Sequence, residues 1–247
     1  MIDDELSQDE ILRGDLKLWQ PKAGYRFTLD PLLLIDFIKE PNLRRICDLG
    51  TGSGIIALGL ALKYPAAKIT AVEIQPRLAA IATRNAQENK LTDRVTVIEM
   101  DIADGKGRIS GGEQDLVVSN PPYRPLGEGT QNAGEEESIA RHEVRLKLSD
   151  LTAEMRRLCI SGGRAALIYP SERLTNLLST LEAESLRPVR LRMVHARQGE
   201  SASRVLVEAR KGAKGNLTVE PPLYLYDGME YSKEARRVLG EDDLIEF

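Results

Sequence analysis

The chain has 247 residues, of which 42% are hydrophobic and 29% charged, and its formal net charge at pH 7 is −4. These values are typical of an ordinary globular chain with one sizeable α/β core, or one domain and a small extension. No apolar run approaches the roughly 18 residues that a membrane-spanning helix needs, and the N-terminus is acidic and unlike a signal peptide. We therefore expect a cytoplasmic protein with no membrane partner.

The cysteines and histidines argue against metal and disulfide chemistry. Cys47 and Cys159 lie far apart in the sequence beside apolar residues, which is typical of buried free thiols in a reducing compartment. His142 and His195 have no cysteine or histidine neighbours at ligand spacing. We expect no disulfide and no metal site.

Predicted strands and helices alternate along most of the chain. Asp30 is the expected N-cap and Pro31 the expected first residue of a helix that reaches residue 38. Five strands are expected at residues 46–49, 68–73, 95–100, 115–119 and 164–169. Helices are expected at residues 55–63, 76–89, 148–160, 171–184 (with a capping signal at Ser171) and, weakly, 232–239. Two longer alternating runs, 189–195 and 204–209, follow each other without a helix between them.

This alternation predicts an α/β fold with a doubly wound, seven-stranded, Rossmann-like sheet that is mostly parallel. The two final strands indicate an antiparallel strand at one edge. We expect an N-terminal segment, 1–40, that covers substrate or cofactor, a central domain, 41–212, and a C-terminal extension, 213–247, that packs on the same domain.

The stretch from Asp115 to Tyr123 reads as a buried strand that ends in a rigid turn. Pro121 and Pro122 fix the backbone there and remove two amide donors. The carbonyl oxygens of Asn120 and Pro121 could then accept hydrogen bonds from a bound group, and Tyr123 offers a flat face for stacking. The pattern predicts a pocket for a planar amino group of a base or carboxamide. The alternative is an ordinary strand-to-loop transition.

Three further candidate contacts follow the first three strands, and ligands of such sheets bind at the carboxyl ends of strands. The glycine loop 50–54 permits a tight turn at a helix N-terminus. Glu73 could accept hydrogen bonds from ribose hydroxyls, and Asp101 from an adenine amino group. A dinucleotide fingerprint would require glycine or alanine where Ile55 stands, so S-adenosylmethionine fits better than NAD.

Several motifs carry a resemblance to a known class of enzyme. Asp48-Leu-Gly-Thr-Gly-Ser-Gly54, Glu73, Asp101 and Asn120-Pro-Pro-Tyr123 resemble, in this order, the motifs of class I S-adenosylmethionine-dependent amino methyltransferases. The stretch from Gly24 to Asp30 resembles the tRNA adenine-N6 methyltransferase family that modifies valine tRNA beside the anticodon. The match covers roughly residues 12 to 210.

The resemblance implies S-adenosylmethionine as cofactor, RNA (tRNA) as substrate, and direct methyl transfer that needs no initial general base. It assigns catalysis to Asn120, Pro121 and Tyr123, and substrate contacts to Tyr123, Arg26 and Phe27. The residues expected to bind the cofactor are Asp48, Gly50, Thr51, Gly52, Gly54, Glu73, Ile74, Asp101, Ile102 and Asn120. We expect a monomer or a homodimer.

Other functions remain open. Protein glutamine methylation, as in the release-factor methyltransferases, uses the same turn, although only 47 residues precede Asp48 here, where those enzymes carry a longer helical domain. Methylation of a guanine amino group in rRNA is a second alternative. DNA adenine methylation would need a recognition domain that is not visible after Tyr123. A non-catalytic nucleotide- or RNA-binding module is the rival from another class.

Basic residues are concentrated between Arg187 and Lys214, where eight Lys or Arg and two Glu give a local charge of +6. Residues 128–137 are acidic instead. A locally basic face on an acidic protein is typical of a nucleic-acid footprint. The alternative is that these charges simply face solvent.

Overall fold

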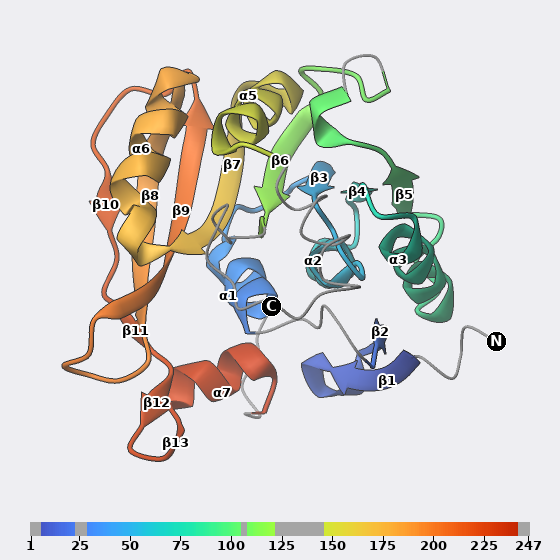
Figure 1. Cartoon of the computed structure of the whole chain (residues 1–247), viewed down its shortest axis with the longest axis horizontal. Helices are drawn as coiled ribbons and strands as arrows, with labels where there is room; N and C mark the ends of the chain where they lie inside the picture. The colour runs from blue at the N-terminus through green and yellow to red at the C-terminus, as the bar shows by residue number, and fades with distance from the viewer. Residues whose placement is uncertain (1–5, 23–28, 105–107, 122–145, 242–247) are drawn as a thin grey trace, which may run out of the picture.

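The computed structural model describes residues 6–22, 29–104, 108–121 and 146–241, and a nine-stranded sheet lies at its centre (Figure 1). The strands of this sheet are β3 (Arg45–Leu49), β4 (Lys68–Glu73), β5 (Val95–Glu99), β6 (Gln114–Ser119), β7 (Cys159–Pro170), β8 (Leu186–His195), β9 (Ala202–Lys211), β10 (Thr218–Val219) and β11 (Leu223–Tyr224). Their order is β10-β8-β9-β7-β6-β3-β4-β5, and β11 also pairs with β8. The predicted doubly wound, mostly parallel α/β fold is confirmed.

The antiparallel strand lies inside the sheet and not at its edge. Strand β9 runs antiparallel to both β7 and β8 and lies between them. Strands β10 and β11 pair in parallel with the outer edge of β8 and extend the sheet beyond the seven expected strands. They are too short to carry an alternating pattern, so no local pattern predicts them.

Helices cover both faces of the sheet (Figure 1). One face carries α1, α2 and α3, and the other carries α5 and α6. The bounds of the helices are α1 (Asp30–Phe37), α2 (Ile55–Lys63), α3 (Pro76–Glu88), α5 (Leu148–Leu158), α6 (Leu174–Ala183) and α7 (Lys233–Leu239). Among the described residues, no helix is long and apolar enough to cross a membrane.

The two hydrophobic cores follow from the period of a strand. Successive side chains of β6 point to opposite faces, so Leu116 and Val118 join the α1/α2 core while Val117 joins the α5/α6 core. Because both faces are covered, the central strands are mostly apolar on both sides and do not alternate regularly with polar residues; the buried Asp48 of β3 is an exception.

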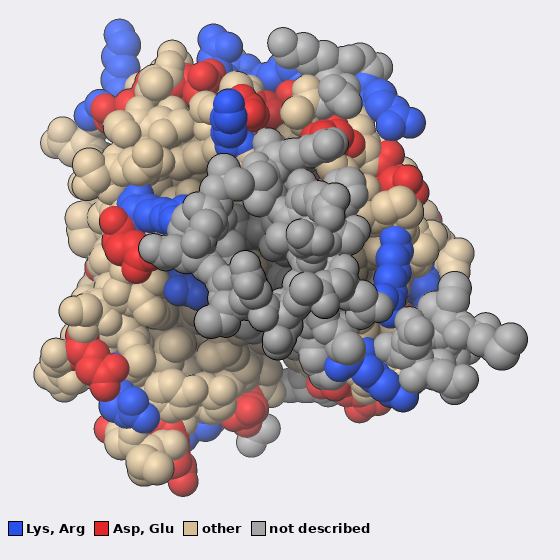
Figure 2. Space-filling model, in the orientation of Figure 1, with Lys and Arg blue, Asp and Glu red and all other residues tan. Residues whose placement is uncertain are grey.

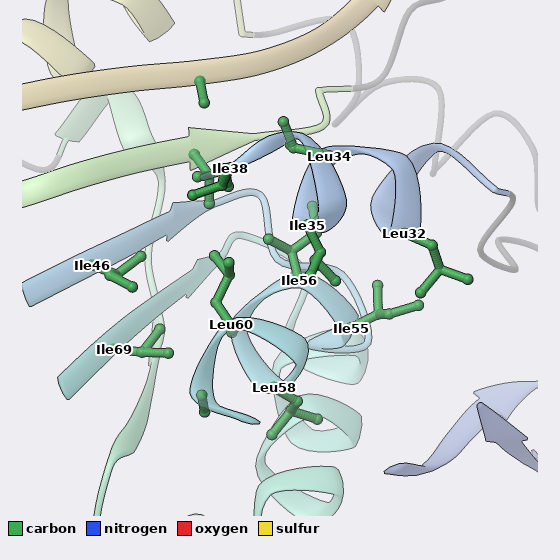
Figure 3. Packing of buried hydrophobic residues seen from close by; sticks show 14 of the residues in the cluster. Leu32, Leu34, Ile35, Ile38, Ile46, Ile55, Ile56, Leu58, Leu60 and Ile69 are labelled. Carbon is green, nitrogen blue, oxygen red and sulfur yellow. The ribbon is translucent and has the colours of Figure 1, made fainter. Parts of the chain in front are cut away.

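Helices α1 and α2 approach each other closely over the first of these cores. Figure 3 shows Ile35 of α1 beside Ile56 of α2. The contact depends on Gly59, because a Cβ atom there would lie 2.5 Å from the Cδ1 atom of Ile35. The missing side chain therefore lets α1 sit on α2 next to the loop that precedes α2.

The expected helix caps are wrong at two places. The N-cap of α1 is Leu29, so Asp30 is the first helical residue, and it accepts a hydrogen bond from Arg204 Nε at 2.9 Å. Ser171 begins a 3-10 turn (Ser171–Arg173) ahead of α6, and its hydroxyl group donates to the carbonyl oxygen of Ala202. In both cases a partner distant in the sequence satisfies the polar side chain.

Short elements at both ends of the chain pack on this framework. The elements of the two ends are β1 (Leu6–Ile11), β2 (Leu16–Pro21), β12 (Tyr226–Asp227) and β13 (Glu230–Tyr231), with a 3-10 turn at Leu12–Gly14. The N-terminal hairpin β1–β2 lies against α3, where Leu6 joins Leu78 and Ile81. Helix α7 packs against α1, and Arg237 Nη1 lies 2.7 Å from Asp36 Oδ1.

Candidate active site

The carboxyl ends of β3, β4 and β6 meet at one edge of the sheet and are tied together by hydrogen bonds. The hydroxyl group of Ser119, at the end of β6, donates to the carbonyl oxygen of Leu49 at 2.7 Å. The amides of Gly50 and Thr51 both donate to the carbonyl oxygen of Val72 at 2.9 Å. The glycine loop thus begins at a fixed point between its two neighbouring strands.

The glycine loop has a backbone that requires glycine at its last position. Gly54 has φ of 93°, in the left-handed region, and a Cβ atom there would lie 3.3 Å from the Cβ atom of Ala82 on α3. Any side chain would therefore be strained and crowded. The loop lies directly on α3, and the N-terminus of α2 follows it.

Asp48 lies beneath this loop and is fully buried. Its Oδ2 atom accepts a hydrogen bond from the hydroxyl group of Thr51 at 2.5 Å, whereas Oδ1 has no hydrogen-bond partner among the described residues. Burial raises the pKa of the Asp48 carboxyl group to about 7. A buried acceptor without a partner is suited to accept a hydrogen bond from a donor group of a ligand.

Glu73 ends β4 and is held by the loop. Its Oε2 atom accepts from the amide of Gly52 at 2.8 Å and Oε1 from the amide of Gln75 at 2.9 Å. Burial raises the pKa of this carboxyl group. Each carboxylate oxygen has a second lone pair, so an oriented Glu73 can still accept a hydrogen bond from a ligand hydroxyl group.

Asp101 follows β5 at the same edge. The amide of Met100 donates to the carbonyl oxygen of Glu73 at 2.8 Å, which places Asp101 beside the end of β4. Its Oδ1 atom accepts from the amide of Ala103 at 2.9 Å in the 3-10 turn Ile102–Asp104. Ile102 is buried and Ile74 is half-buried. The structure therefore brings the predicted cofactor residues to one edge of the sheet.

The predicted catalytic turn is described only in part. Asn120 is half-buried and Pro121 is buried, directly after Ser119. Tyr123, Arg26 and Phe27 lie outside the described residues.

One residue of the site escaped the sequence analysis. Asn85 on α3 is fully buried, and its Nδ2 atom donates to the carbonyl oxygen of Ser53 in the glycine loop at 2.8 Å. The available signal was a polar residue between Ala82 and Ala86 on the apolar face of the helix. A buried amide at such a position requires partners, and here they come from other elements.

Ion pairs offset part of the positive charge of the basic stretch 187–214. Five of its arginines pair with acidic side chains within 4.0 Å, and these pairs are Arg187–Glu182, Arg190–Glu208, Arg192–Glu234, Arg197–Glu200 and Arg204–Asp30. On the face drawn in Figure 2, Lys and Arg side chains are interspersed with Asp and Glu. Three of these acids, Glu182, Glu234 and Asp30, lie outside the stretch, so they offset only part of its local charge of +6. The nucleic-acid footprint stays a prediction.

The fold and the matched family model define the class of protein. Residues 29–147 match the family model "Methyltransferase small domain". A crystal structure of a "predicted O-methyltransferase" from Agrobacterium tumefaciens superposes with a TM-score of 0.68 at 22% identity and covers 86% of this chain and 96% of that one. The protein is a methyltransferase with the Rossmann-like fold that uses S-adenosylmethionine.

Curated relatives narrow the class. The tRNA1(Val) (adenine(37)-N6)-methyltransferase of Aeromonas hydrophila is 36% identical over 77% of this chain and 79% of its own length. That of Pedobacter heparinus is 28% identical over 92% and 94%. The chain belongs to the tRNA1(Val) (adenine(37)-N6)-methyltransferase family. A release factor glutamine methyltransferase from Chlorobaculum tepidum is 35% identical over 51% of this chain and 48% of its own length.

Proposed function

We propose that the protein methylates the N6 atom of an adenine beside the anticodon of a valine tRNA, with S-adenosylmethionine as methyl donor. The relatives that match most of the chain carry this activity in their names. The observation that carries the proposal is the placement of Asn120 and Pro121 directly beside the glycine loop, through the bond between Ser119 and Leu49.

The unsatisfied oxygen of Asp48 fits the cofactor. S-adenosylmethionine supplies an electrophilic methyl group on a sulfonium sulfur, and its methionyl part carries a protonated amino group. Asp48 Oδ1 is a buried acceptor without a partner in the described residues, at the base of the loop that begins with Gly50. In the proposal, Asp48 accepts from that amino group, and the positive charge favours the ionised carboxylate.

Glu73 and Asp101 complete the proposed cofactor site. Glu73 is oriented by two backbone amides, so its remaining lone pairs would accept from the ribose hydroxyls. Asp101 would accept from the adenine amino group, and the apolar side chains of Ile74 and Ile102 would cover the adenine faces. Because these groups are held by backbone contacts, they are in place before the cofactor binds.

The proposed chemistry belongs to Asn120 and Pro121. An adenine N6 lone pair is delocalised into the ring, so the amino group is a poor nucleophile. The side-chain oxygen of Asn120 and the main-chain oxygen of Pro121 would accept hydrogen bonds from it and stabilise the positive charge that develops on nitrogen. Holding the amino group in line with the donor methyl group supplies the remaining rate enhancement. The proton leaves after transfer.

The RNA contacts complete the proposal. Tyr123 would stack on the extruded target base, and Arg26 and Phe27 would contact the neighbouring RNA. The N-terminal segment 1–40 would cover the bound cofactor or substrate, in keeping with the contact between β2 and α3 next to the loop. These assignments follow from the residue types and from the family resemblance.

Replacement of Asn120 tests the mechanism. We expect Asn120→Ala to lower the rate of methyl transfer at least about 100-fold, which is the scale for losing one group that stabilises a transition state. Cofactor affinity, measured by calorimetry, should stay within about twofold of wild type. Asn176→Ala, which changes an exposed asparagine on α6, is the control and should leave both quantities unchanged. A near-normal rate in Asn120→Ala contradicts the mechanism.

The substrate is tested separately with labelled S-adenosylmethionine and unmodified bulk tRNA, rRNA and release factor in parallel reactions. We expect the label in tRNA, as N6-methyladenosine identified by nucleoside mass spectrometry. The similarity to a release factor glutamine methyltransferase makes the protein reaction the meaningful alternative. Label on the release factor alone would overturn the tRNA substrate and leave the amino-group chemistry intact.

A further inference from the structure

Two asparagines, Asn85 in α3 and Asn89 at its C-cap, bind the backbone of β2 as a neighbouring strand would. The amide of Trp19 donates to Asn85 Oδ1 at 2.7 Å, and Asn85 Nδ2 donates to the carbonyl oxygen of Trp19 at 3.0 Å. One helical turn later, the amide of Lys17 donates to Asn89 Oδ1 at 2.9 Å, and Asn89 Nδ2 donates to the carbonyl oxygen of Lys17 at 2.7 Å. The two side chains thus hold alternate residues of the same strand in the same way.

Asn85 has a further contact, and it leads to the glycine loop. The Nδ2 atom of Asn85 donates to the carbonyl oxygen of Ser53 at 2.8 Å, whereas that of Asn89 donates to the carbonyl oxygen of Asn85 at 2.7 Å. One turn before Asn85, Ala82 lies against Gly54. Helix α3 therefore supports the loop at two adjacent points, and one of them is shared with the N-terminal hairpin.

Few other residues could replace Asn85 at this buried position. Its side chain is fully buried, so its removal would leave the carbonyl oxygen of Ser53 and the amide of Trp19 without these partners in the interior. An unsatisfied buried group costs the full desolvation penalty, which favours a local rearrangement. The loop and the hairpin are the two segments that can rearrange. Helix α3 itself is held in place because its Ala86 packs in the core against the sheet.

We propose that Asn85 is a positioning residue for the cofactor. It holds the glycine loop 50–54 in its binding conformation by connecting the loop to the hairpin β1–β2. The inference rests on the proposal that this loop holds S-adenosylmethionine. The amide fixes the carbonyl group of Ser53, and with it the turn whose Gly52 amide orients Glu73. Asn89 anchors the same hairpin without contributing to the loop.

Linkage makes the coupling reciprocal. If Asn85 joins hairpin and loop, a bound cofactor that stabilises the loop must also stabilise the contact between Asn85 and Trp19, by the same factor. The contact between Asn89 and Lys17 lies one helical turn further from the loop, so cofactor binding should stabilise it less. The two asparagines therefore provide a matched comparison within one helix.

The first experiment compares cofactor binding in Asn85→Ala and Asn89→Ala by calorimetry, together with initial rates of methyl transfer. Both variants lose two bonds to the hairpin, but only Asn85→Ala loses the bond to Ser53. We expect the Kd for S-adenosylmethionine to rise roughly tenfold in Asn85→Ala, within the range of typical coupling energies. The Kd should change less than about twofold in Asn89→Ala, and kcat at saturating cofactor should persist in both.

Equal effects of the two variants on Kd, or an effect of Asn85→Ala on kcat alone, would overturn the positioning role. The wild-type titration separates this outcome from failure of the proposed function. A wild-type protein without saturable affinity for S-adenosylmethionine contradicts the cofactor site itself. A wild-type protein that binds, with variants that bind alike, contradicts the inference only.

The second experiment uses the unaltered protein, so it decides the question even if Asn85→Ala does not fold. Hydrogen exchange of backbone amides is measured with and without saturating S-adenosylmethionine. We expect exchange of the Trp19 amide to slow roughly tenfold when the cofactor binds, and that of the Lys17 amide to slow less. Unchanged exchange at Trp19, with protection confined to the loop, would show that loop and hairpin are independent.

Discussion

At the scale of single residues, the site is built from carboxylates that are held away from water before any ligand arrives. Asp48 and Glu73 are buried, and their observed donors are a hydroxyl group and backbone amides. Burial without a cation raises the pKa of both carboxyl groups. The free protein carries this electrostatic cost, which a cationic ligand relieves.

The raised pKa of Asp48 predicts how stability depends on pH. In the folded protein the pKa is about 7 and in the unfolded chain it is near its ordinary value of 3.8, so the folded state binds more protons between these values. The stability of the ligand-free protein should therefore fall as pH rises from about 4 to 7 and then level off. We expect Asp48→Asn to gain stability relative to wild type between pH 5 and pH 8, by on the order of 1–3 kcal/mol.

Urea denaturation of both proteins at pH 5 and pH 8 measures this difference. Glu73 also contributes to the slope in wild type and is present in the variant too, so the difference between the two proteins reports Asp48 together with its electrostatic interaction with Glu73. An unchanged difference between the two proteins across this range would show that Asp48 is ionised in the folded state.

Asp101 offers a prediction about affinity. If its carboxylate accepts from the adenine amino group, Asp101→Ala should weaken S-adenosylmethionine binding about tenfold, the equivalent of one hydrogen bond to a charged group. Glu99→Ala is the control, because Glu99 is an exposed carboxylate two residues away at the end of β5. Calorimetry should show a raised Kd in the first variant and wild-type affinity in the second. Equal affinity in all three proteins would remove Asp101 from the site.

At the scale of elements, the sequence predicted what depends on local pattern. The expected ranges 55–63 and 68–73 coincide with α2 and β4, since an apolar helix after a glycine loop and a short apolar strand are both local signals. The order of cofactor motifs was equally visible, because strand ends in a parallel sheet gather at one edge. These features need no knowledge of distant partners.

The hairpin β1–β2 could not be predicted in the same way. Its sequence is mostly polar apart from buried leucines such as Leu16 and Leu18, and its backbone is also held by side-chain amides about 70 residues later in the chain. Asp30 was mistaken for a helix cap for a related reason, because its partner Arg204 is 174 residues away. In both cases the polar side chains bind partners far away in the sequence, and a local sequence pattern contains no information about such partners.

The core between α1, α2 and the sheet allows a test of packing. Leu60 of α2 is fully buried, and Figure 3 shows it directed between the helix and the strands. We expect Leu60→Ala to lower the free energy of unfolding by about 2–5 kcal/mol, through lost burial and the cavity that remains. Leu62→Ala removes the same atoms from a half-buried position in the same helix and should cost less than half as much. Similar urea midpoints for the two variants would contradict this account.

At the scale of the whole molecule, ion pairs join the basic strands to other parts of the chain. The Nη1 and Nη2 atoms of Arg192 on β8 donate to the two carboxylate oxygens of Glu234 on α7, at 2.7 and 2.8 Å. The side chain of Arg192 is 11% exposed, so it depends on this partner. Two arginines of the basic stretch, Arg190 and Arg192, therefore connect β8 to the C-terminal residues Glu220 and Glu234.

This predicts unequal effects for two glutamates that pair with arginines of β8. Glu234→Ala leaves Arg192 without its paired carboxylate, so we expect a loss of about 1–3 kcal/mol in the free energy of unfolding. Glu182→Ala removes the partner of Arg187 in an exposed pair, with side chains 46% and 52% exposed, and should cost less than about 0.5 kcal/mol. Urea denaturation distinguishes the two. A loss in Glu234→Ala as small as that in Glu182→Ala would show that the tail is not fastened by this pair.

The outer edge of β8 also has a consequence for biosynthesis. Its backbone partners on that side, β10 and β11, follow β9 in the sequence and are therefore translated after both β8 and β9. Until residue 224 emerges, the nascent chain presents an unpaired edge to other chains, a known route to aggregation. At typical elongation rates the ribosome needs about 1–3 s to pass from the end of β9 to the end of β11. Slow codons in this short interval would prolong the exposure, and rapid translation would limit it.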